Sequence, residues 1–268
     1  MSDTPQTSGR EERSDFLNAL LKGVLLGAVV LAIVLPWRLG YFSKQPAPPS
    51  PAVATAPAPS QALPPTVPPP PKILADFGRE PASDDARQVA NWALYSGDNA
   101  GKSVVIVDKR QAKVYLFSPQ GELKGATPAL LGLAHGDHTV PGIGDLPLSQ
   151  VTPDMRTTPA GRFVAEAGVN THNEDIVWVD YNAAVSMHRV RPLVKAERRL
   201  ERLASATADD NRISYGCINL PVAFYEKVLS PTVRGGGGAI IYVLPETQTA
   251  AALFGSYNPP VTQQVAQR

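Results

Sequence analysis

The segment SVVIVDKRQAKVYLFS, residues 103–118, has the pattern of a β-hairpin. Its two halves, SVVIVD and KVYLFS, are rich in the β-branched and aromatic residues that favour strands. They flank a polar turn at residues 109–112, and the second half ends at the turn-rich sequence SPQGE. We expect this hairpin to open a β-sheet.

Other segments extend the pattern away from the hairpin. Four have the same strand-forming composition, namely GRFVAEA (161–167), DIVWVD (175–180), AVSMH (184–188) and AIIYVL (239–244). Three are helical: a short amphipathic helix capped by Asp84, a charged and largely solvated stretch at 192–205, and a helix at 221–229 that begins with proline. The predicted fold is α+β and mainly β, a curved sheet or sandwich with short helices over residues 73–245, followed by a polar tail at 246–268.

The N-terminal part predicts a membrane anchor. Residues 1–15 are polar, and the apolar run at 17–35 would span about 28 Å as a helix, close to the thickness of a bilayer core. We therefore expect a transmembrane anchor at 16–37. A cleaved signal peptide is the alternative, but the sequence PWRLGYFS that follows offers no small-residue cleavage site. Arg10, Arg13 and Lys22 lie before or inside the span, which favours a cytoplasmic N-terminal segment and a periplasmic domain.

Residues 45–72 form a linker rich in proline and alanine. Of the 27 prolines in the chain, 12 lie between Pro46 and Pro71. Such a composition cannot bury a core and favours extended polyproline conformations, which would reach about 80 Å. We expect a spacer that holds the folded domain away from its membrane.

Charge and cysteine content limit the possible functions. The chain has 25 basic and 24 acidic residues, a net charge of +1, and therefore no basic excess for nucleic acid. Cys217 is the only cysteine, so no intramolecular disulfide can form. A lone thiol is most often a small buried apolar group, and its surroundings decide whether it is more than that.

The surroundings of Cys217 predict a nucleophile. In RISYGCINLP (212–221) the thiol follows Gly216 and precedes a predicted helix. Glycine permits a tight turn whose N–H groups converge on a developing oxyanion, and a helix N-terminus would lower the pKa of the thiol. His188, at the end of a predicted strand, is the candidate base, because an imidazole that accepts the thiol proton raises nucleophilicity and later protonates the leaving amine. Arg189 follows it, so a main-chain carbonyl is expected to orient the ring.

Three blocks carry a resemblance to the L,D-transpeptidase catalytic domain, over about residues 102–244. SYGCIN resembles that family's cysteine signature, SMHRV places His188 where the family has its base, and TTPAGRF (157–163) resembles its T-P-x-G-x-F strand entry. The order of the blocks also agrees. Two features depart from the family: Tyr215 replaces a usual histidine, and His188 and Cys217 are 29 positions apart, with an inserted charged segment at 190–211 between them.

The resemblance implies an acyl transfer. The Cys217 thiolate would attack a tetrapeptide stem of peptidoglycan, release the terminal D-residue and pass the acyl group from a thioester to an amine, with no metal or cofactor. Gly216 would supply an oxyanion N–H, and Ser214, Asn219, Arg189 and Arg212 are the substrate-binding candidates. Two alternatives stay open: a carboxypeptidase or hydrolase that uses water as acceptor, and a tethered murein-binding domain with little turnover.

The motif HGDH at 135–138 invites a metal interpretation. Its two histidines are three positions apart in a glycine-rich loop, and the sequence offers no third ligand. We expect instead a solvated or substrate-lining loop.

Overall fold

The computed structural model describes residues 72–235 and 237–260. Its central layer is a five-stranded sheet with the order β3-β2-β1-β11-β5. The strands are β1 (Ser103–Asp108), β2 (Lys113–Phe117), β3 (Leu123–Pro128), β5 (Gly161–Val164) and β11 (Ala239–Val243). The predicted hairpin is confirmed, since β1 and β2 pair antiparallel. The last predicted strand, β11, pairs in parallel with β1 and lies inside this sheet.

A second sheet has the order β10-β8-β7-β6. Its strands are β6 (Glu166–Val169), β7 (Asp175–Asp180), β8 (Val185–Arg189) and β10 (Ile218–Leu220), and the short strands β4 (Leu131–Gly132) and β9 (Arg212–Ser214) pair beside it. The expectation of one strand over GRFVAEA is wrong, because β5 and β6 belong to different sheets. The chain turns at Ala165, whose N–H donates to Ala239 O at 2.9 Å.

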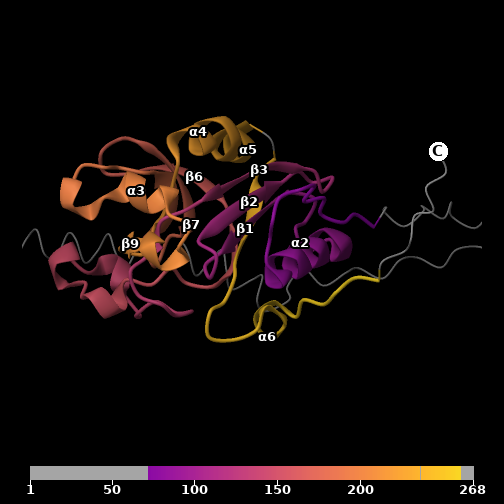
Figure 1. Ribbon diagram of the computed structural model, residues 1–268, viewed down its shortest axis with the longest axis horizontal. Helices are drawn as coiled ribbons and strands as arrows, with labels where there is room; N and C mark the ends of the chain where they lie inside the picture. The colour runs from indigo at the N-terminus through magenta and orange to yellow at the C-terminus, as the bar shows by residue number, and fades with distance from the viewer. Residues whose placement is uncertain (1–71, 236, 261–268) are drawn as a thin grey trace, which may run out of the picture. The chain divides into compact units, whose positions relative to one another are not determined.

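Two apolar clusters hold the layers together, one on each face of the central sheet. Alternate residues of β1 divide between them: Val104 and Ile106 face the cluster that contains α2 (Asp84–Ser96), whereas Val105 and Val107 face the second sheet. Figure 1 shows α2 and α6 (Ala250–Phe254) on one side of β1, β2 and β3, with α4 and α5 on the other. A mainly β sandwich with short helices is therefore what the chain forms, as predicted.

Helix α2 buries the apolar face that its sequence predicts, but its N-cap is Ser83 rather than Asp84. The Ser83 hydroxyl accepts from Ala86 N at 3.1 Å, and Gly97 ends the helix with φ of 79°. Residues 246–260, predicted as a polar tail, pack on the domain instead: α6 contributes Ala250 to the α2 cluster, and Gln88 donates to Ser256 O.

The helix predicted at 221–229 is longer than expected. It consists of α4 (Val222–Phe224), a π-helical turn η6 (Tyr225–Leu229) and α5 (Ser230–Gly235). Tyr225 and Leu229 are buried, as their spacing predicts, but Val222 is 44% exposed. The charged stretch after β8 forms a 3-10 turn η4 (Lys195–Glu197) and α3 (Arg199–Ala204), and Leu203 of α3 is buried against Leu130. The remaining 3-10 turns are η1 (Ile143–Asp145), η2 (Leu148–Gln150), η3 (Pro153–Met155) and η5 (Ala208–Asn211).

Across residues 72–260, Gly236 apart, no helix is long and apolar enough to cross a bilayer. The predicted anchor at 16–37 and nearly all of the linker at 45–72 lie outside the described residues, so both stay predictions.

Candidate active site around Cys217

The parallel pairing of β8 with β10 brings the predicted nucleophile and base together. In this register Ile218 lies beside Met187 and Asn219 beside His188. Met187 and Ile218 are fully buried in the core between the sheets. Because side chains alternate along a strand, Ser186 and His188 share the opposite face of β8. Cys217, one residue before Ile218, reaches the same face.

The sulfur of Cys217 lies among hydrogen-bonding groups. Ser186 Oγ is 3.7 Å from Sγ, and the carbonyl oxygen of Ala184 is 3.6 Å away. Burial by itself favours the neutral thiol, but the hydrogen bond to His188, the charge of its ring and the Ser186 N–H and hydroxyl outweigh it and lower the pKa of Cys217. Ser186 was missed by the sequence reading, although its position two residues before His188 on one strand places both side chains on one face.

The ring of His188 is oriented by the carbonyl of its own neighbour. Nδ1–H donates to Arg189 O at 2.8 Å, which leaves Nε2 as the basic nitrogen of the neutral ring. The sequence predicts that a main-chain carbonyl orients this ring, and the structure identifies it as the carbonyl of Arg189. Burial favours the neutral ring, but hydrogen bonding to Cys217 and the thiolate charge outweigh it, and the pKa of His188 is raised. The raised pKa of His188 and the lowered pKa of Cys217 are both shifts in the direction of a thiolate–imidazolium pair.

Asn219 is a neighbour of the base, not a surface group that faces a ligand. Its side chain is buried, with Nδ2 at 3.3 Å from His188 Nε2 and 3.3 Å from Cys217 O. Arg199 of α3 donates to Asn219 Oδ1 at 2.5 Å, which fixes the amide with its NH₂ group toward His188. Asn219 thus contacts the base and the main chain of Cys217, its predicted substrate-binding role stays a prediction, and Arg199 of the charged segment at 190–211 is its partner.

The turn before Cys217 is held by its own side chains. Ser214 is buried, donates to Cys217 O at 2.6 Å and accepts from Gly216 N at 3.1 Å, so it does not face a substrate as predicted. Gly216 has φ of 127°, and a Cβ there would lie 2.9 Å from Thr157 O. The Gly216 N–H is already bonded to Ser214, which contradicts its predicted role as oxyanion donor. Thr158, not identified from the sequence, donates from its hydroxyl to Gly216 O at 2.7 Å.

Cys217 does not lie at a helix N-terminus. Strand β10 separates it from α4, so the expected contribution of a helix dipole to the thiol pKa is wrong. The lowered pKa instead has its source in His188 and Ser186.

The predicted carboxylate-binding arginines are already paired. Arg189 donates to Asp175 at 2.7 Å and Glu226 at 2.8 Å, and the buried Arg212 binds Glu246. Each guanidinium is thus held in part by carboxylates of the protein itself, and Arg212 is also buried. Their substrate-binding roles stay predictions.

The HGDH loop contributes Asp137 to a buried ionic cluster. Lys109 and Asp137, whose side chains are completely buried, are 3.1 Å apart, and Lys109 Nζ is 3.5 Å from Glu246. Hydrogen bonds from Thr247, from the Glu246 N–H and from Lys109 outweigh burial and hold the pKa of Asp137 well below its usual range. The loop, predicted to be solvated or substrate-lining, is therefore anchored by the buried Asp137, whereas His135 and His138 are exposed.

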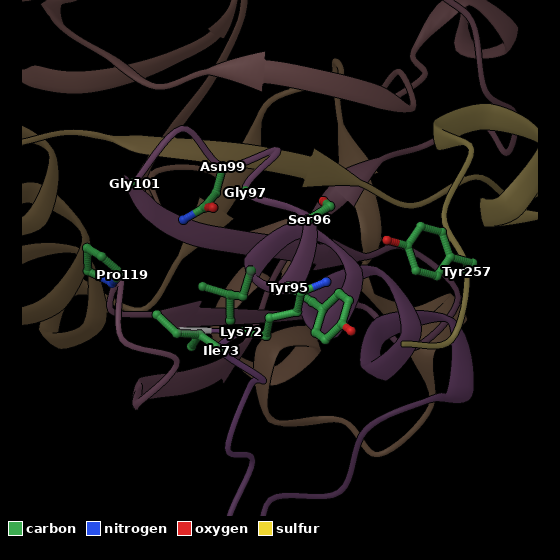
Figure 2. A pocket seen from close by; sticks show the side chains of 10 residues that line it. Lys72, Ile73, Tyr95, Ser96, Gly97, Asn99, Gly101, Pro119 and Tyr257 are labelled. Atoms are coloured by element: carbon green, nitrogen blue, oxygen red, sulfur yellow. The ribbon is translucent and has the colours of Figure 1, made fainter. Parts of the chain in front are cut away.

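One sizeable pocket lies apart from this chemistry. It has a volume of about 560 Å³ and is lined by the end of α2 together with Lys72, Pro119 and Tyr257 (Figure 2). None of the predicted site residues lines it, so its size is no guide to where the thiol acts.

Comparisons with known proteins give weak likenesses. No protein-family model matches the chain, and no curated protein matches it. Among solved structures, it is similar to an L,D-transpeptidase from Mycobacterium smegmatis, with 15% identity, a TM-score of 0.31 and coverage of 53% of this chain and 58% of that one. It is also similar to the catalytic domain of an L,D-transpeptidase from E. faecium, with 16% identity, a TM-score of 0.32 and coverage of 54% and 98%. A third, from Xylanimonas cellulosilytica, is 13% identical with a TM-score of 0.32, and the match covers 53% of this chain and 60% of that one.

Proposed function

We propose that this chain is a cysteine acyltransferase of the L,D-transpeptidase type. The observation that supports this most directly is that the pairing of β8 with β10 places Cys217 and His188 on one face, where each shifts the pKa of the other: the thiol pKa is lowered and the imidazole pKa is raised. A buried structural cysteine has no such partner and a raised pKa. The resemblance of the blocks around both residues adds the reaction class and the substrate.

The proposed chemistry follows from the tautomer of His188. Nε2 takes the Sγ proton, and the thiolate attacks the carbonyl carbon that precedes the terminal D-residue of a tetrapeptide stem. The tetrahedral oxyanion needs donors other than the Gly216 N–H, and we assign the main-chain N–H of Cys217. The imidazolium then protonates the leaving amine, the C–N bond breaks, and the D-residue departs from a Cys217 thioester. An acceptor amine attacks the thioester, gives up a proton to His188 and restores the thiol.

The setting of the reaction is also a proposal. An uncleaved anchor at 16–37 and the linker at 45–72 would place the domain in the periplasm of a bacterium, tethered to the inner membrane and within reach of peptidoglycan. The Pro-rich composition of the linker supports this, because polyproline spacers stay extended. The N-terminal segment 1–15 would then lie in the cytoplasm.

Product analysis tests this function. Full-length protein is recovered from the membrane pellet after alkaline washing, as the anchor requires, dissolved in detergent micelles and incubated with a disaccharide tetrapeptide. Mass spectrometry is expected to show release of one D-residue and a cross-linked dimer. Tripeptide without any cross-link would favour the carboxypeptidase alternative. No product at all would favour the murein-binding alternative and contradict the proposal.

The pH dependence of alkylation tests the activated pair. Because Cys217 is the only thiol, iodoacetamide reports on a single group. Its lowered pKa predicts that the rate reaches half its maximum at a pH below 9.0, the ordinary value for a thiol. The thiolate is favoured by the imidazolium, so His188→Gln should move this midpoint upward toward the ordinary value. A wild-type midpoint at or above 9.0 would show that the pair does not form.

A further inference from the structure

A cationic side chain, that of Arg156, lies just before β5 and beside the turn that precedes Cys217. Arg156 precedes Thr157 and Thr158, which contact Gly216 through the Thr157 carbonyl and the Thr158 hydroxyl. The guanidinium carbon of Arg156 lies 3.9 Å from the ring centroid of Tyr215, two residues before the nucleophile. Cation–π contact of this kind holds a guanidinium flat against an aromatic face.

One edge of the Arg156 guanidinium is hydrogen-bonded to the main chain, and the other edge is not. Nε and Nη2 donate to Val151 O at 3.4 Å and 3.2 Å, so one edge of the group is fixed on the main chain. No carboxylate in the described part of the chain lies within 4 Å of Arg156, although Arg189, Arg191, Arg199 and Arg212 all have one. The nearby Asp154 accepts from Thr152 instead. The edge formed by Nη1 and the second N–H of Nη2 remains for a ligand.

We infer that Arg156, stacked on Tyr215, binds a free carboxylate of the stem peptide while the Cys217 thiolate attacks a carbonyl carbon of the same peptide. This inference rests on the proposed function and adds how the substrate is recognised. A guanidinium edge presents two parallel N–H groups that match the two oxygens of a carboxylate. Tyr215 is 40% exposed, so the stacked pair lies at the surface where a peptide arrives. Tyr215, which stands where the L,D-transpeptidase signature usually has histidine, would thus hold the Arg156 guanidinium in place.

The experiment compares Arg156→Met with Arg79→Met, a control that removes the same charge from an exposed arginine without a salt bridge in the described residues. Full-length variants are given three tetrapeptide donors: unmodified, amidated at the terminal carboxyl, and amidated at the side-chain carboxyl of the third residue. We expect Arg156→Met to lower kcat/KM for the unmodified donor by about tenfold to a hundredfold, mainly through KM. One of the amidated donors should be insensitive to the substitution, and which one it is identifies the carboxylate.

Tyr215 variants provide the second readout. Tyr215→Phe keeps the ring and should behave as wild type, whereas Tyr215→Ala should reproduce the donor pattern of Arg156→Met. The inference is overturned if wild type uses all three donors equally well, or if Arg156→Met slows all three by the same factor, which would indicate a structural role. A wild-type protein that uses none of the donors would instead contradict the proposed function itself.

Discussion

Cys217→Ala is expected to abolish covalent acylation of the full-length protein by a carbapenem, and His188→Gln to slow it by about 10²- to 10⁴-fold. The first variant removes the only sulfur nucleophile in the chain, and the second removes the acceptor of its proton. Intact-protein mass spectrometry measures the adduct as one added mass per chain over time.

Two controls make this result specific. Arg79→Met should be acylated at the wild-type rate, because Arg79 is exposed. Far-ultraviolet circular dichroism should show all variants folded. An adduct that persists in Cys217→Ala would place the reactive group elsewhere, and full-rate acylation of His188→Gln would remove the imidazole from the mechanism.

Lys109→Met is expected to destabilise the folded domain by about 3–5 kcal/mol, the usual cost of leaving a buried carboxylate without its partner. The substitution keeps the length of the side chain but leaves Asp137 and Glu246 facing no ammonium. It also removes the hydrogen bond to the carbonyl of Thr158, the residue whose hydroxyl donates to Gly216 O. Urea unfolding followed by tryptophan fluorescence measures the change in the free energy of unfolding.

The matched control is Lys124→Met, which breaks the exposed Lys124–Glu122 pair with the same change of charge. Exposed pairs contribute about 0–1 kcal/mol, so this variant should remain close to wild type. If both variants lose the same small amount, the buried cluster is not what holds the HGDH loop. Partial recovery in the double variant Lys109→Met/Asp137→Asn would confirm that an unpaired charge is the cause.

Much of the fold could be predicted because its longer strands carry their own pattern. SVVIVD and DIVWVD match β1 and β7 residue for residue, since four β-branched or aromatic residues in succession are a strong local signal. Strands β4, β9 and β10 have only two or three residues each and show no periodicity. The parallel pairing of β1 with β11 joins the two ends of the domain, and no local pattern encodes it.

Helix ends were harder to place for a related reason. The helix predicted at 221–229 continues past Leu229, although Pro231 lacks an N–H and a proline normally ends a helix. The π-helical turn η6 changes the hydrogen-bond spacing ahead of the proline, and the helix continues to Gly235. This accommodation depends on packing of Tyr225 and Leu229 in the core, which the local sequence does not reveal.

The candidate site likewise contains residues that the sequence indicates and residues whose orientation it does not encode. Cys217 and His188 were identified because residue type, glycine spacing and block order all indicate them. The roles of Ser214, Asn219, Arg189 and Arg212 were assigned from proximity in sequence, and proximity cannot show which way a side chain faces. Register decides that question, because the pairing of β8 with β10 turns Asn219 toward His188.

The contact of Arg199 with Asn219 bears on how freely the segment at 190–211 can be exchanged. A segment on the surface of a domain can usually be inserted or replaced without effect on the chemistry of the site. Here the segment at 190–211 reaches the amide next to Nε2 of His188 through Arg199, so a change in this segment would also change the hydrogen bonding of that nitrogen. Transplanting a shorter loop from a homologue would release the amide to rotate and offer its oxygen to the imidazole. Loop chimeras of this protein would therefore be altered in the proton chemistry of His188.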